Sequence, residues 1–319
     1  MSAAAEAVRG QRAALLTDAL KGLVSTPKTL PCKWLYDEEG ARLFEAITRL
    51  PEYYPTRAEM RILRDHAREM ADGVAAGAAV IEFGSGSAEK VGLLLDALPG
   101  PSAYVPVDIA PDWLAGAAER VAAAHPGLRV LPAVADFTQP FALPRGVPPG
   151  APRLGFFPGS TIGNFEPFAA TAFLASARRV LGPGAWMVIG ADLVKDRAVL
   201  EAAYDDAAGV TARFNMNILA RLNRECGADF ELDGFRHRAH WNAPLERVEM
   251  HLVSRRAQSV TLAGRRIRFD AGETIHTENS HKYRPDRFRG LSRDGGWEPA
   301  RMWTDPDGLF SVWLLAATG

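Results

Sequence analysis

The sequence predicts an α/β protein whose core is a doubly wound, mostly parallel sheet, interrupted by a second lobe of α+β type. Two patterns support this prediction. Between residues 58 and 194, apolar runs of strand length alternate with segments of helical period, which is typical of buried parallel strands joined by helices. Between residues 195 and 283 this alternation stops, and a long helical stretch is followed by several strand-like segments.

The elements of the predicted core follow one another with short connections. In order along the chain, they are a helix over Ala58–Ala71, a strand over Ala78–Phe83, a helix over Ala88–Ala97, a strand over Ser102–Val107, a helix over Asp112–Ala124, strands over Leu128–Val134 and Arg153–Phe157, a helix over Phe168–Val180 and a strand over Ala185–Ala191. The tail adds strand-like segments at Glu298–Thr304 and Leu309–Leu315, which fit a β-hairpin that closes the sheet. We therefore assign residues 58–194 and 284–319 to this core.

The second lobe is predicted from residues 1–57 and 195–283. Residues 1–20 have the pattern of an amphipathic helix, and residues 199–225 form a long helical stretch. Four strands are then expected, at Phe235–Trp241, Arg247–Ser254, Gln258–Leu262 and Arg265–Phe269. Because both parts lie outside the alternating pattern, we expect them to form one lobe that covers the substrate.

The composition limits the classes of partner. The chain has 319 residues with 37 basic and 38 acidic side chains, so its net charge of -1 gives no field that would attract nucleic acid or an anionic membrane. Glu6 and Arg9 interrupt the first apolar stretch, so no signal peptide is expected, and no apolar run is long enough to span a membrane. Only two cysteines are present, which favours a reducing compartment. We expect a cytoplasmic monomer that acts on a small molecule.

A glycine-rich turn follows the first predicted strand of the core. Glu82 ends the strand, and Gly84 and Gly86 let the backbone approach a ligand at the start of the next helix. A dinucleotide fingerprint would need a further glycine at position 89, where the chain has glutamate. An acidic residue followed by two glycines fits S-adenosylmethionine (SAM) better, although a tight turn alone would also explain these glycines.

The next two strand ends each carry a suitable polar group. Asp108 ends the second strand, where a carboxylate can accept both hydroxyls of a ribose, or else cap the next helix. Asp136 and Phe137 follow the third strand; the carboxylate can accept from the amine of an adenine and the ring can pack on its face, or Asp136 is only a turn residue. Together the three strand ends favour a Rossmann-like class I SAM-dependent methyltransferase fold.

The fourth strand ends in a loop over residues 156–165, where the acceptor is usually bound in such a sheet. This loop offers the Asn164 amide, which can bind a carboxylate or an amine. It contains no cysteine for nucleophilic attack and no Asp-Pro-Pro-Tyr sequence of the kind found in base-modifying enzymes. The loop therefore favours a small polar acceptor.

Five segments spread over nearly the whole chain resemble one family. They are residues 31–37 (PCKWLYD), 47–57 (ITRLPEYYPTR), 82–90 (EFGSGSAEK), 157–164 (FPGSTIGN) and 277–283 (TENSHKY). In these segments the sequence resembles the histidine-specific methyltransferases of ergothioneine biosynthesis, which trimethylate the α-amine of L-histidine to hercynine. The string LPEYYPTR is the most distinctive of the matches.

The resemblance implies roles for particular residues. The implied SAM contacts are Tyr36, Gly84, Gly86, Lys90, Asp108, Asp136 and Phe137. The implied substrate contacts are Tyr53, Asn164, Tyr204, Met250, Glu278 and Ser280, with Tyr204 on the carboxylate and Met250 beside the imidazole. Tyr36, Tyr53 and Asn164 are the candidates to orient the reacting amine, and none of them is assigned as an obligatory base.

Glu278 and Ser280 suit an imidazole on physical grounds as well. A neutral imidazole has one donor and one acceptor nitrogen, and a carboxylate and a hydroxyl at i and i+2 on one face of a strand can bind both. Asn279 stands where an aliphatic residue is expected from the family. In a strand it should point away from both neighbours, and imidazole specificity would be in doubt only if it pointed into the pocket.

Two other functions remain open from the sequence. The acceptor could be another aromatic amino acid, such as a tryptophan derivative in related fungal enzymes, although an indole has no acceptor nitrogen to match the Glu278–Ser280 pair. The protein could also bind SAM without catalysis, but such a protein would not need the acceptor residues. His237, His240 and His251 could be considered as a metal set, but no metal site is expected, because His237 and His240 should lie on opposite faces of a strand.

Overall fold

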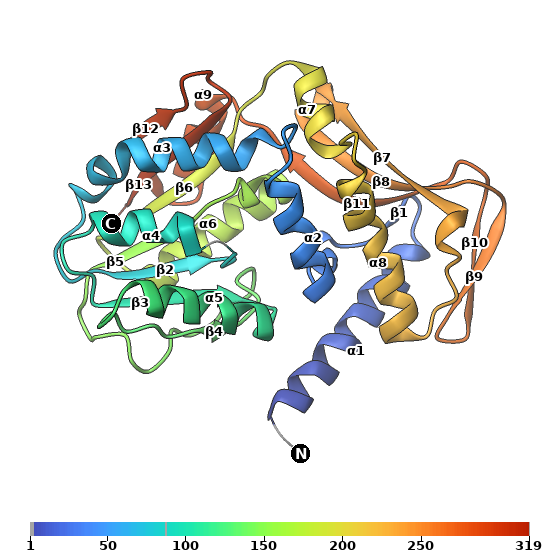
Figure 1. Ribbon diagram of the computed structural model, residues 1–319, viewed down its shortest axis with the longest axis horizontal. Coiled ribbons are helices and arrows are strands. Elements are labelled where there is room, and N and C mark those ends of the chain that lie inside the picture. Colours follow the sequence, from blue (N-terminus) through green and yellow to red (C-terminus); the bar gives the residue numbers. More distant parts are fainter. Residues whose placement is uncertain (1–2, 87, 319) are drawn as a thin grey trace. The chain divides into compact units, whose positions relative to one another are not determined.

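The structure is a computed structural model that describes residues 3–86 and 88–318. It divides the chain into two compact units, coloured along the sequence in Figure 1. Unit 1 comprises Met1–Tyr53 and Asp196–Asn279, and unit 2 comprises Tyr54–Lys195 and Ser280–Gly319. The boundaries expected from the sequence lie within four residues of these junctions. Among the described residues, no helix is both long and apolar enough to cross a membrane.

Unit 2 is built on a sheet of seven strands. They are β2 (Ala79–Phe83), β3 (Ala103–Asp108), β4 (Ala133–Val134), β5 (Arg153–Phe157), β6 (Trp186–Asp192), β12 (Trp297–Thr304) and β13 (Phe310–Ala317). Their order across the sheet is β12-β13-β6-β5-β2-β3-β4. The strands β2 to β6 are parallel to their neighbours among themselves, while β13 runs antiparallel to both β6 and β12. The predicted doubly wound sheet and its closing hairpin are confirmed.

The order of the strands reverses beside β2. Ala79 of β2 pairs with Ala103 of β3 on one side and with Arg153 of β5 on the other. Ligands of open α/β sheets bind at the carboxyl ends of the strands where the order reverses. The loops after β2 and β5 are therefore the part of unit 2 where a small molecule is expected.

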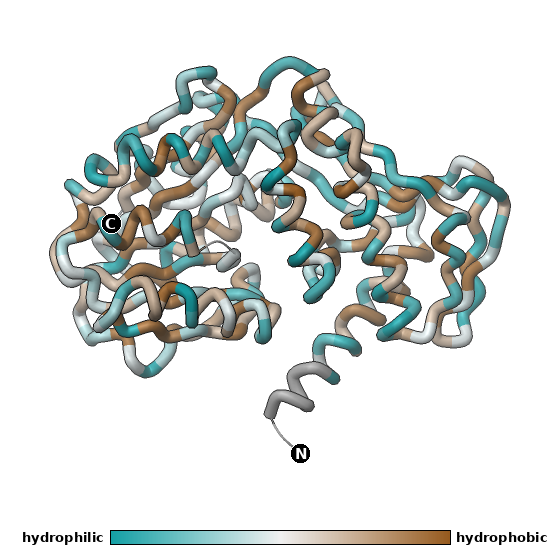
Figure 2. Tube along the Cα trace, viewed as in Figure 1, coloured by the Kyte–Doolittle hydropathy of each residue, from teal (hydrophilic) through white to brown (hydrophobic). Residues whose placement is uncertain are grey.

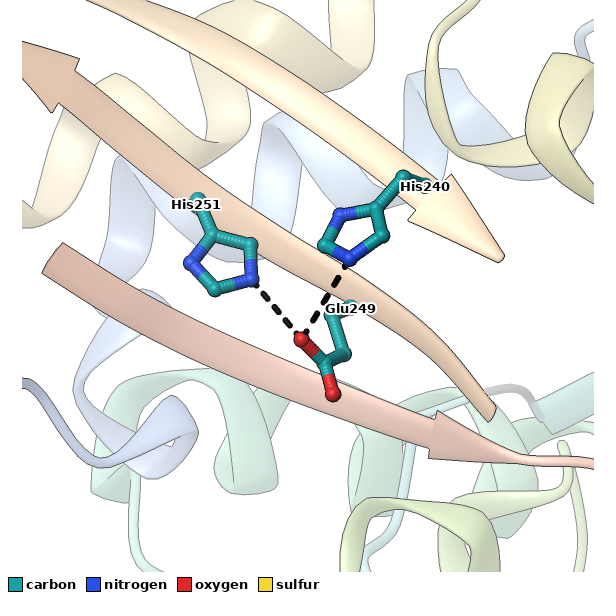
Figure 3. Close-up of side chains that lie close together, drawn as sticks. All are labelled: His240, Glu249 and His251. Carbon is teal, nitrogen blue, oxygen red and sulfur yellow. Dashed lines mark hydrogen bonds and ion pairs between the residues drawn. The ribbon is translucent and has the colours of Figure 1, made fainter. Parts of the chain in front are cut away.

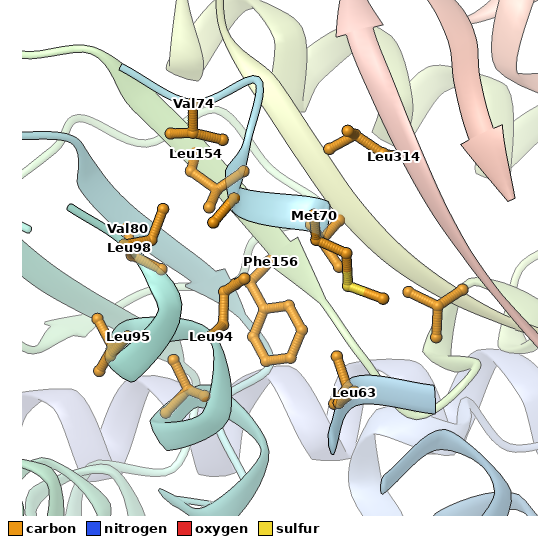
Figure 4. Packing of buried hydrophobic residues seen from close by; sticks show 14 of the residues in the cluster. Leu63, Met70, Val74, Val80, Leu94, Leu95, Leu98, Leu154, Phe156 and Leu314 are labelled. Carbon is orange, nitrogen blue, oxygen red and sulfur yellow. The ribbon is translucent and has the colours of Figure 1, made fainter. Parts of the chain in front are cut away.

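Helices cover both faces of this sheet. Their bounds are α3 (Tyr54–Ala71), α4 (Ala88–Ala97), α5 (Pro111–Ala124), α6 (Pro167–Leu181) and α9 (Pro285–Asp294). One apolar cluster joins α3 and α4 to the sheet, with Leu63, Leu94 and Phe156 at most 1% exposed (Figure 4). A second cluster joins α6 and α9 to the opposite face. Hydrophobic segments accordingly concentrate along the strands in Figure 2. These two layers fix the strand ends that carry the predicted cofactor residues.

Unit 1 combines helices with a four-stranded sheet of order β1-β11-β8-β7. Its strands are β1 (Lys28–Thr29), β7 (Phe235–Asn242), β8 (Arg247–Ser254) and β11 (Thr274–His281), and a separate hairpin joins β9 (Gln258–Leu262) to β10 (Arg265–Phe269). Its helices are α1 (Ala3–Leu23), η1 (Cys32–Leu35), α2 (Glu38–Thr48), α7 (Arg197–Tyr204) and α8 (Val210–Cys226). Strand β11 contains the boundary between the units, so Glu278 and Ser280 share one strand but belong to different units.

Three sequence expectations for the fold were wrong. The stretch 199–225 is two helices, because Asp206 accepts hydrogen bonds from the amides of Val210 and Thr211 and so caps a new helix. The strand expected over residues 128–134 pairs continuously only at β4, since Pro132 has no N–H to donate. Helix α9 was not anticipated, although Pro285 starts it in the position that proline favours.

Candidate active site

The turn after β2 depends on its first glycine. Gly84 has a φ of +73°, which residues with a side chain rarely adopt, and a Cβ there would lie 3.4 Å from the Phe137 ring. Phe137 itself packs in a cluster of phenylalanines from the neighbouring loops, including Phe83 and Phe157. The structure thus brings Gly84 and Phe137 together, while a Cβ on Gly86 would meet no atom within 4 Å.

Glu82 is fully buried beneath this turn. Its Oε2 accepts hydrogen bonds from the Tyr104 hydroxyl and from Ser85 Oγ. Burial raises the pKa of Glu82 to about 8, although these hydrogen bonds oppose the shift. Its Oε1 atom is buried without a hydrogen-bond partner among the described residues. An unpaired buried oxygen beside a glycine turn is a feature that a polar ligand such as SAM can satisfy.

Two carboxylates lie at the next strand ends. Asp108 accepts a hydrogen bond from the Ala110 amide at 2.9 Å, and burial raises its pKa to about 6. Asp136 Oδ1 accepts from both the amide and the hydroxyl of Thr138, which is the turn arrangement considered from the sequence. Both residues thus have local structural roles. They are nevertheless at the strand ends where a ribose and an adenine would be bound.

Lys90 has a partner within unit 2. Its Nζ donates to Glu59 Oε2 at 2.6 Å, and both side chains are buried. Glu59 also accepts from the Gly159 amide at 2.9 Å, so the pair links α3, α4 and the loop after β5. This link explains why Lys90 is buried. The contact between Lys90 and SAM that the sequence suggested remains a prediction.

The loop after β5 packs closely against the end of β11. A Cβ on Gly163 would lie 2.7 Å from the carbonyl oxygen of His281, so only glycine fits there. Ser160, with a φ of 57°, accepts a hydrogen bond from the Asp192 amide through its Oγ at 2.9 Å. Asn164 is the last residue of η2 (Thr161–Asn164) and directly follows Gly163, so it lies close to the end of β11.

Ser280 is held by a buried charge network in unit 2. Lys282 Nζ donates to Ser280 Oγ at 2.8 Å and lies 2.8 Å from Asp192 Oδ2. Lys195 donates to the other oxygen, Asp192 Oδ1, at 2.6 Å, and Tyr54 donates to Oδ2 at 2.7 Å. Burial opposes ionisation of Asp192, but the two lysines outweigh it and hold its pKa below the usual value. Ser280 is thus bound to a salt-bridge network in which the Lys282 and Asp192 side chains are fully buried and that of Lys195 is 8% exposed.

An aromatic cluster forms in unit 1 around Tyr36. Its ring lies 5.3 Å from that of Phe214 and 5.6 Å from that of Phe44, centroid to centroid. Tyr53 contacts Phe44 at 6.1 Å and Tyr204 at 6.2 Å in the same way. Helices α2, α7 and α8 thus bring together tyrosines that are far apart in the sequence.

The charge of Glu278 acts on this cluster. Burial raises the pKa of Tyr36 well above its ordinary value, and the Glu278 carboxylate and the neighbouring tyrosines raise it further. Burial and the same carboxylate raise the pKa of the Cys32 thiol to about 12. Tyr36 therefore keeps its proton at neutral pH and is a hydrogen-bond donor, while Cys32 is not a nucleophile.

Asn279 has a partner on its own strand. Burial lowers the pKa of His276, and the nearby Asn279 side chain opposes that shift. His276 Nε2 lies 3.1 Å from the carbonyl oxygen of Glu278. Met250, on the neighbouring strand β8, is buried, and its carbonyl accepts from Thr277 at 3.0 Å. The asparagine that departs from the family pattern is therefore engaged with His276.

Comparison with known proteins gives consistent results. A family described as histidine-specific, SAM-dependent methyltransferases matches residues 15–317. Proteins named histidine N-alpha-methyltransferase are 44% identical in Mycolicibacterium smegmatis, over 94% of both chains, and 43% identical in Mycobacterium tuberculosis, over 95% of both chains. Ergothioneine biosynthesis protein 1 of Neurospora crassa is 32% identical over 87% of this chain, which covers 32% of that longer protein. A solved SAM-dependent methyltransferase from Clostridium acetobutylicum is 10% identical, over 87% of this chain and 96% of its own, with a TM-score of 0.47.

The family match covers nearly all of the described chain. The protein belongs to the SAM-dependent histidine-specific methyltransferases. The family resemblance, the fold class and the SAM dependence predicted from the sequence are thus confirmed.

Within this methyltransferase, the predicted site residues divide between the two units. Unit 2 carries Gly84, Gly86, Lys90, Asp108, Asp136, Phe137, Asn164 and Ser280. Unit 1 carries Tyr36, Tyr53, Tyr204, Met250 and Glu278. The structure groups the three tyrosines with Glu278, and Gly84 with Phe137. The individual roles of these residues remain predictions.

Sequence reasoning missed the residues that support this methyltransferase site. Phe214 packs against Tyr36. Lys282 and Asp192 hold Ser280. Lys282 lies in the string TENSHKY, two positions after Ser280, so the i, i+2 rule that paired Glu278 with Ser280 could have identified it. Nothing in the local sequence connects Asp192 or Phe214 with the site.

Proposed function

We propose that this protein uses SAM to methylate the α-amino group of L-histidine three times, which gives hercynine in the first step of ergothioneine biosynthesis. The observation that carries this proposal is the 44% identity to a histidine N-alpha-methyltransferase along 94% of both chains. The two cysteines, neither of them in a disulfide, support a cytoplasmic location. We propose unit 1 as the part that recognises the amino acid.

We propose that unit 2 supplies the part of the site that binds SAM. SAM supplies a methyl group on a positively charged sulfur, which needs no covalent help from the protein. Gly84 gives its backbone room beside Phe137, and the Asp108 carboxylate can accept the ribose hydroxyls at the end of β3. Glu82 Oε1, buried without a partner among the described residues, is a further polar group that fits a ligand at this edge.

We propose that Glu278 and Ser280 form the part of the site that binds the imidazole ring of histidine. An ammonium group can only donate, so in the Lys282–Ser280 hydrogen bond the serine oxygen is the acceptor. The remaining Ser280 proton can then be donated to an imidazole nitrogen, while Glu278 accepts from the N–H of the other nitrogen. We therefore propose that Lys282 sets the direction of the Ser280 hydroxyl and that the pair selects the neutral imidazole.

The reacting amine must be neutral, because a protonated ammonium has no lone pair to attack the methyl group. Tyr36 keeps its proton at neutral pH, so it is not a base. Its hydroxyl oxygen can accept a hydrogen bond from an amine N–H, which orients the amine and leaves the lone pair free to attack. Each transfer leaves a positively charged nitrogen, which loses a proton to solvent before the next transfer. After the third transfer no N–H remains, and the aromatic cluster around Tyr36 offers ring faces that suit a quaternary ammonium.

A methylation assay tests this function. Purified protein is incubated with SAM and each amino acid in turn, and the products are identified by mass. We expect histidine to gain three methyl groups, and Glu278→Ala to abolish most of this product. Methylation of tryptophan instead would retain the SAM-dependent chemistry but overturn the imidazole assignment. SAM binding without any methylated amino acid would indicate a SAM-binding protein of another kind.

A further inference from the structure

We infer that unit 1 contains a binding site for a divalent transition-metal ion of the Zn²⁺ class, formed by His240, Glu249 and His251 (Figure 3). One ligand atom from each of these side chains lies within 4.8 Å of the other two. None of the three residues is among those proposed to contact SAM or histidine, although Met250 lies between Glu249 and His251 on β8. The inference does not depend on the proposed function.

The fold brings these three side chains together from two adjacent strands. His240 of β7 lies directly opposite Glu249 of β8 in the antiparallel register. His251 is two residues beyond Glu249 on the same strand, so both point to the same face. Imidazole and carboxylate are ligands that Zn²⁺ accepts, and three protein ligands leave a position for water.

The distances suit a metal after a small adjustment. His251 Nε2 lies 3.0 Å and His240 Nε2 lies 3.6 Å from the same atom, Glu249 Oε2. Tetrahedral zinc with bonds of about 2.0–2.1 Å separates neighbouring ligands by about 3.3 Å. His240, whose side chain is one-third exposed, can move inward, whereas Glu249 and His251 are buried.

The surroundings of Glu249 prepare its Oε2 for a ligand. Arg247 and Asn242 donate to the other oxygen, Oε1, at 2.8 and 2.9 Å, and so orient the carboxylate as outer partners of metal ligands do. Because the positive charge of the nearby Arg247 repels a cation, we expect the affinity for Zn²⁺ to be lower than that of a structural zinc site.

The rings of His240 and His251 stack with their centroids 5.2 Å apart, and both present Nε2 to the same oxygen of Glu249. Their Nδ1 atoms, which are not the proposed ligand atoms, have no hydrogen-bond partner in the described part of the chain. The sequence argument against a metal site rested on His237 and His240. In the structure the residue that joins His240 and His251 is Glu249, which that argument did not consider.

Metal titration of the tag-free protein tests the site. We expect one Zn²⁺ per chain by calorimetry, and Co²⁺ should give visible absorption bands of a low-symmetry site with nitrogen ligands. His240→Ala changes a partly exposed side chain and should weaken Zn²⁺ binding at least tenfold. Asn242→Ala should weaken it about 10- to 100-fold through the carboxylate orientation. Mg²⁺, which prefers oxygen ligands, should not compete.

His66→Ala is the matched control. His66 forms a comparable histidine–glutamate pair, with Nδ1 2.8 Å from Glu69 Oε1, but has no third ligand nearby among the described residues. This variant should bind Zn²⁺ as the unchanged protein does. Absence of stoichiometric Zn²⁺ binding, or equal binding by the His240→Ala protein, would overturn the inference. Circular dichroism of each variant separates loss of the site from loss of the fold.

Discussion

Two regions of the molecule are constructed in different ways. One is the edge of the unit 2 sheet that carries Gly84, Asp108 and Asp136, here called the cofactor edge, and the other is the aromatic cluster of unit 1. Each polar group at the cofactor edge follows a strand of one sheet and is tied to a nearby partner, as Asp108 is to Ala110 and Asp136 to Thr138. The aromatic cluster gathers Tyr36 and Tyr53 from two loops and Tyr204 from the end of α7, and the charge of Glu278 acts on it. The first arrangement follows from topology, and the second follows from packing between distant segments.

This difference predicts different consequences of substitution. A side chain at the cofactor edge has a structural partner, so its replacement should affect stability and SAM binding together. The side chains of the aromatic cluster and Glu278 of β11 are the ones we propose to contact the amino acid, so their replacement should change the acceptor kinetics more than the stability. The following predictions test that division.

The largest effect is expected from Glu278→Gln. The substitution keeps the size of the side chain but removes the charge that accepts from the imidazole, and loss of a buried charged partner costs about 2–5 kcal/mol. We expect kcat/KM for histidine to fall by about 10²- to 10³-fold, with SAM affinity unchanged in equilibrium binding. A fall in SAM affinity of similar size would contradict the division between the two regions.

A smaller effect is expected from Lys282→Met. This lysine donates to Ser280, and a hydrogen bond to a charged group contributes about 1.5–3 kcal/mol, so kcat/KM for histidine should fall by about 10- to 100-fold. Steady-state kinetics at saturating SAM should show the loss mainly in KM.

Lys195→Met is the matched control for this prediction. Lys195 pairs with the same Asp192 carboxylate, and its other hydrogen bonds go to the Tyr54 hydroxyl and the Leu193 carbonyl. Both variants should lower the melting temperature, and only Lys282→Met should raise the KM for histidine. Equal kinetic losses in both would mean that Lys282 acts through the fold alone.

These two regions also differ in how far the sequence could predict them. Gly84, Asp108 and Asp136 were found because strand ends meet at one edge of a parallel sheet. Tyr36, Tyr53 and Tyr204 were proposed only through the family resemblance, since no local sequence period relates two loop residues to the end of α7. The helix break at residues 205–209 was missed because a single capping carboxylate, Asp206, outweighed a helical pattern. Asp192 was missed because its two lysine partners are distant or follow it in a loop.

Asp108 gives a prediction of pH dependence at the cofactor edge. Burial raises its pKa to about 6, and ribose hydroxyls donate to the ionised form. Affinity for SAM should therefore be constant above about pH 7 and should fall by up to tenfold per unit as the pH drops below 6. Calorimetry between pH 5 and 8 measures this dependence, and Asp108→Asn should bind weakly with a flatter profile over the same range. An unchanged profile in Asp108→Asn would assign the titration to another group.

The smallest effect is expected from Asn279→Val, which restores an aliphatic side chain at the position where the sequence departs from its family. The Asn279 side chain interacts with His276 and, in a strand, should point away from Glu278 and Ser280, so we do not expect it to contact the amino acid. We expect kcat/KM for histidine to change by less than about threefold, while loss of one buried hydrogen bond lowers stability by about 1 kcal/mol. Thermal unfolding and acceptor kinetics on the same preparation separate the two effects. If Asn279→Val instead changes the preference between histidine and other aromatic amino acids, residue 279 takes part in recognition, and the imidazole pocket includes more of β11 than Glu278 and Ser280.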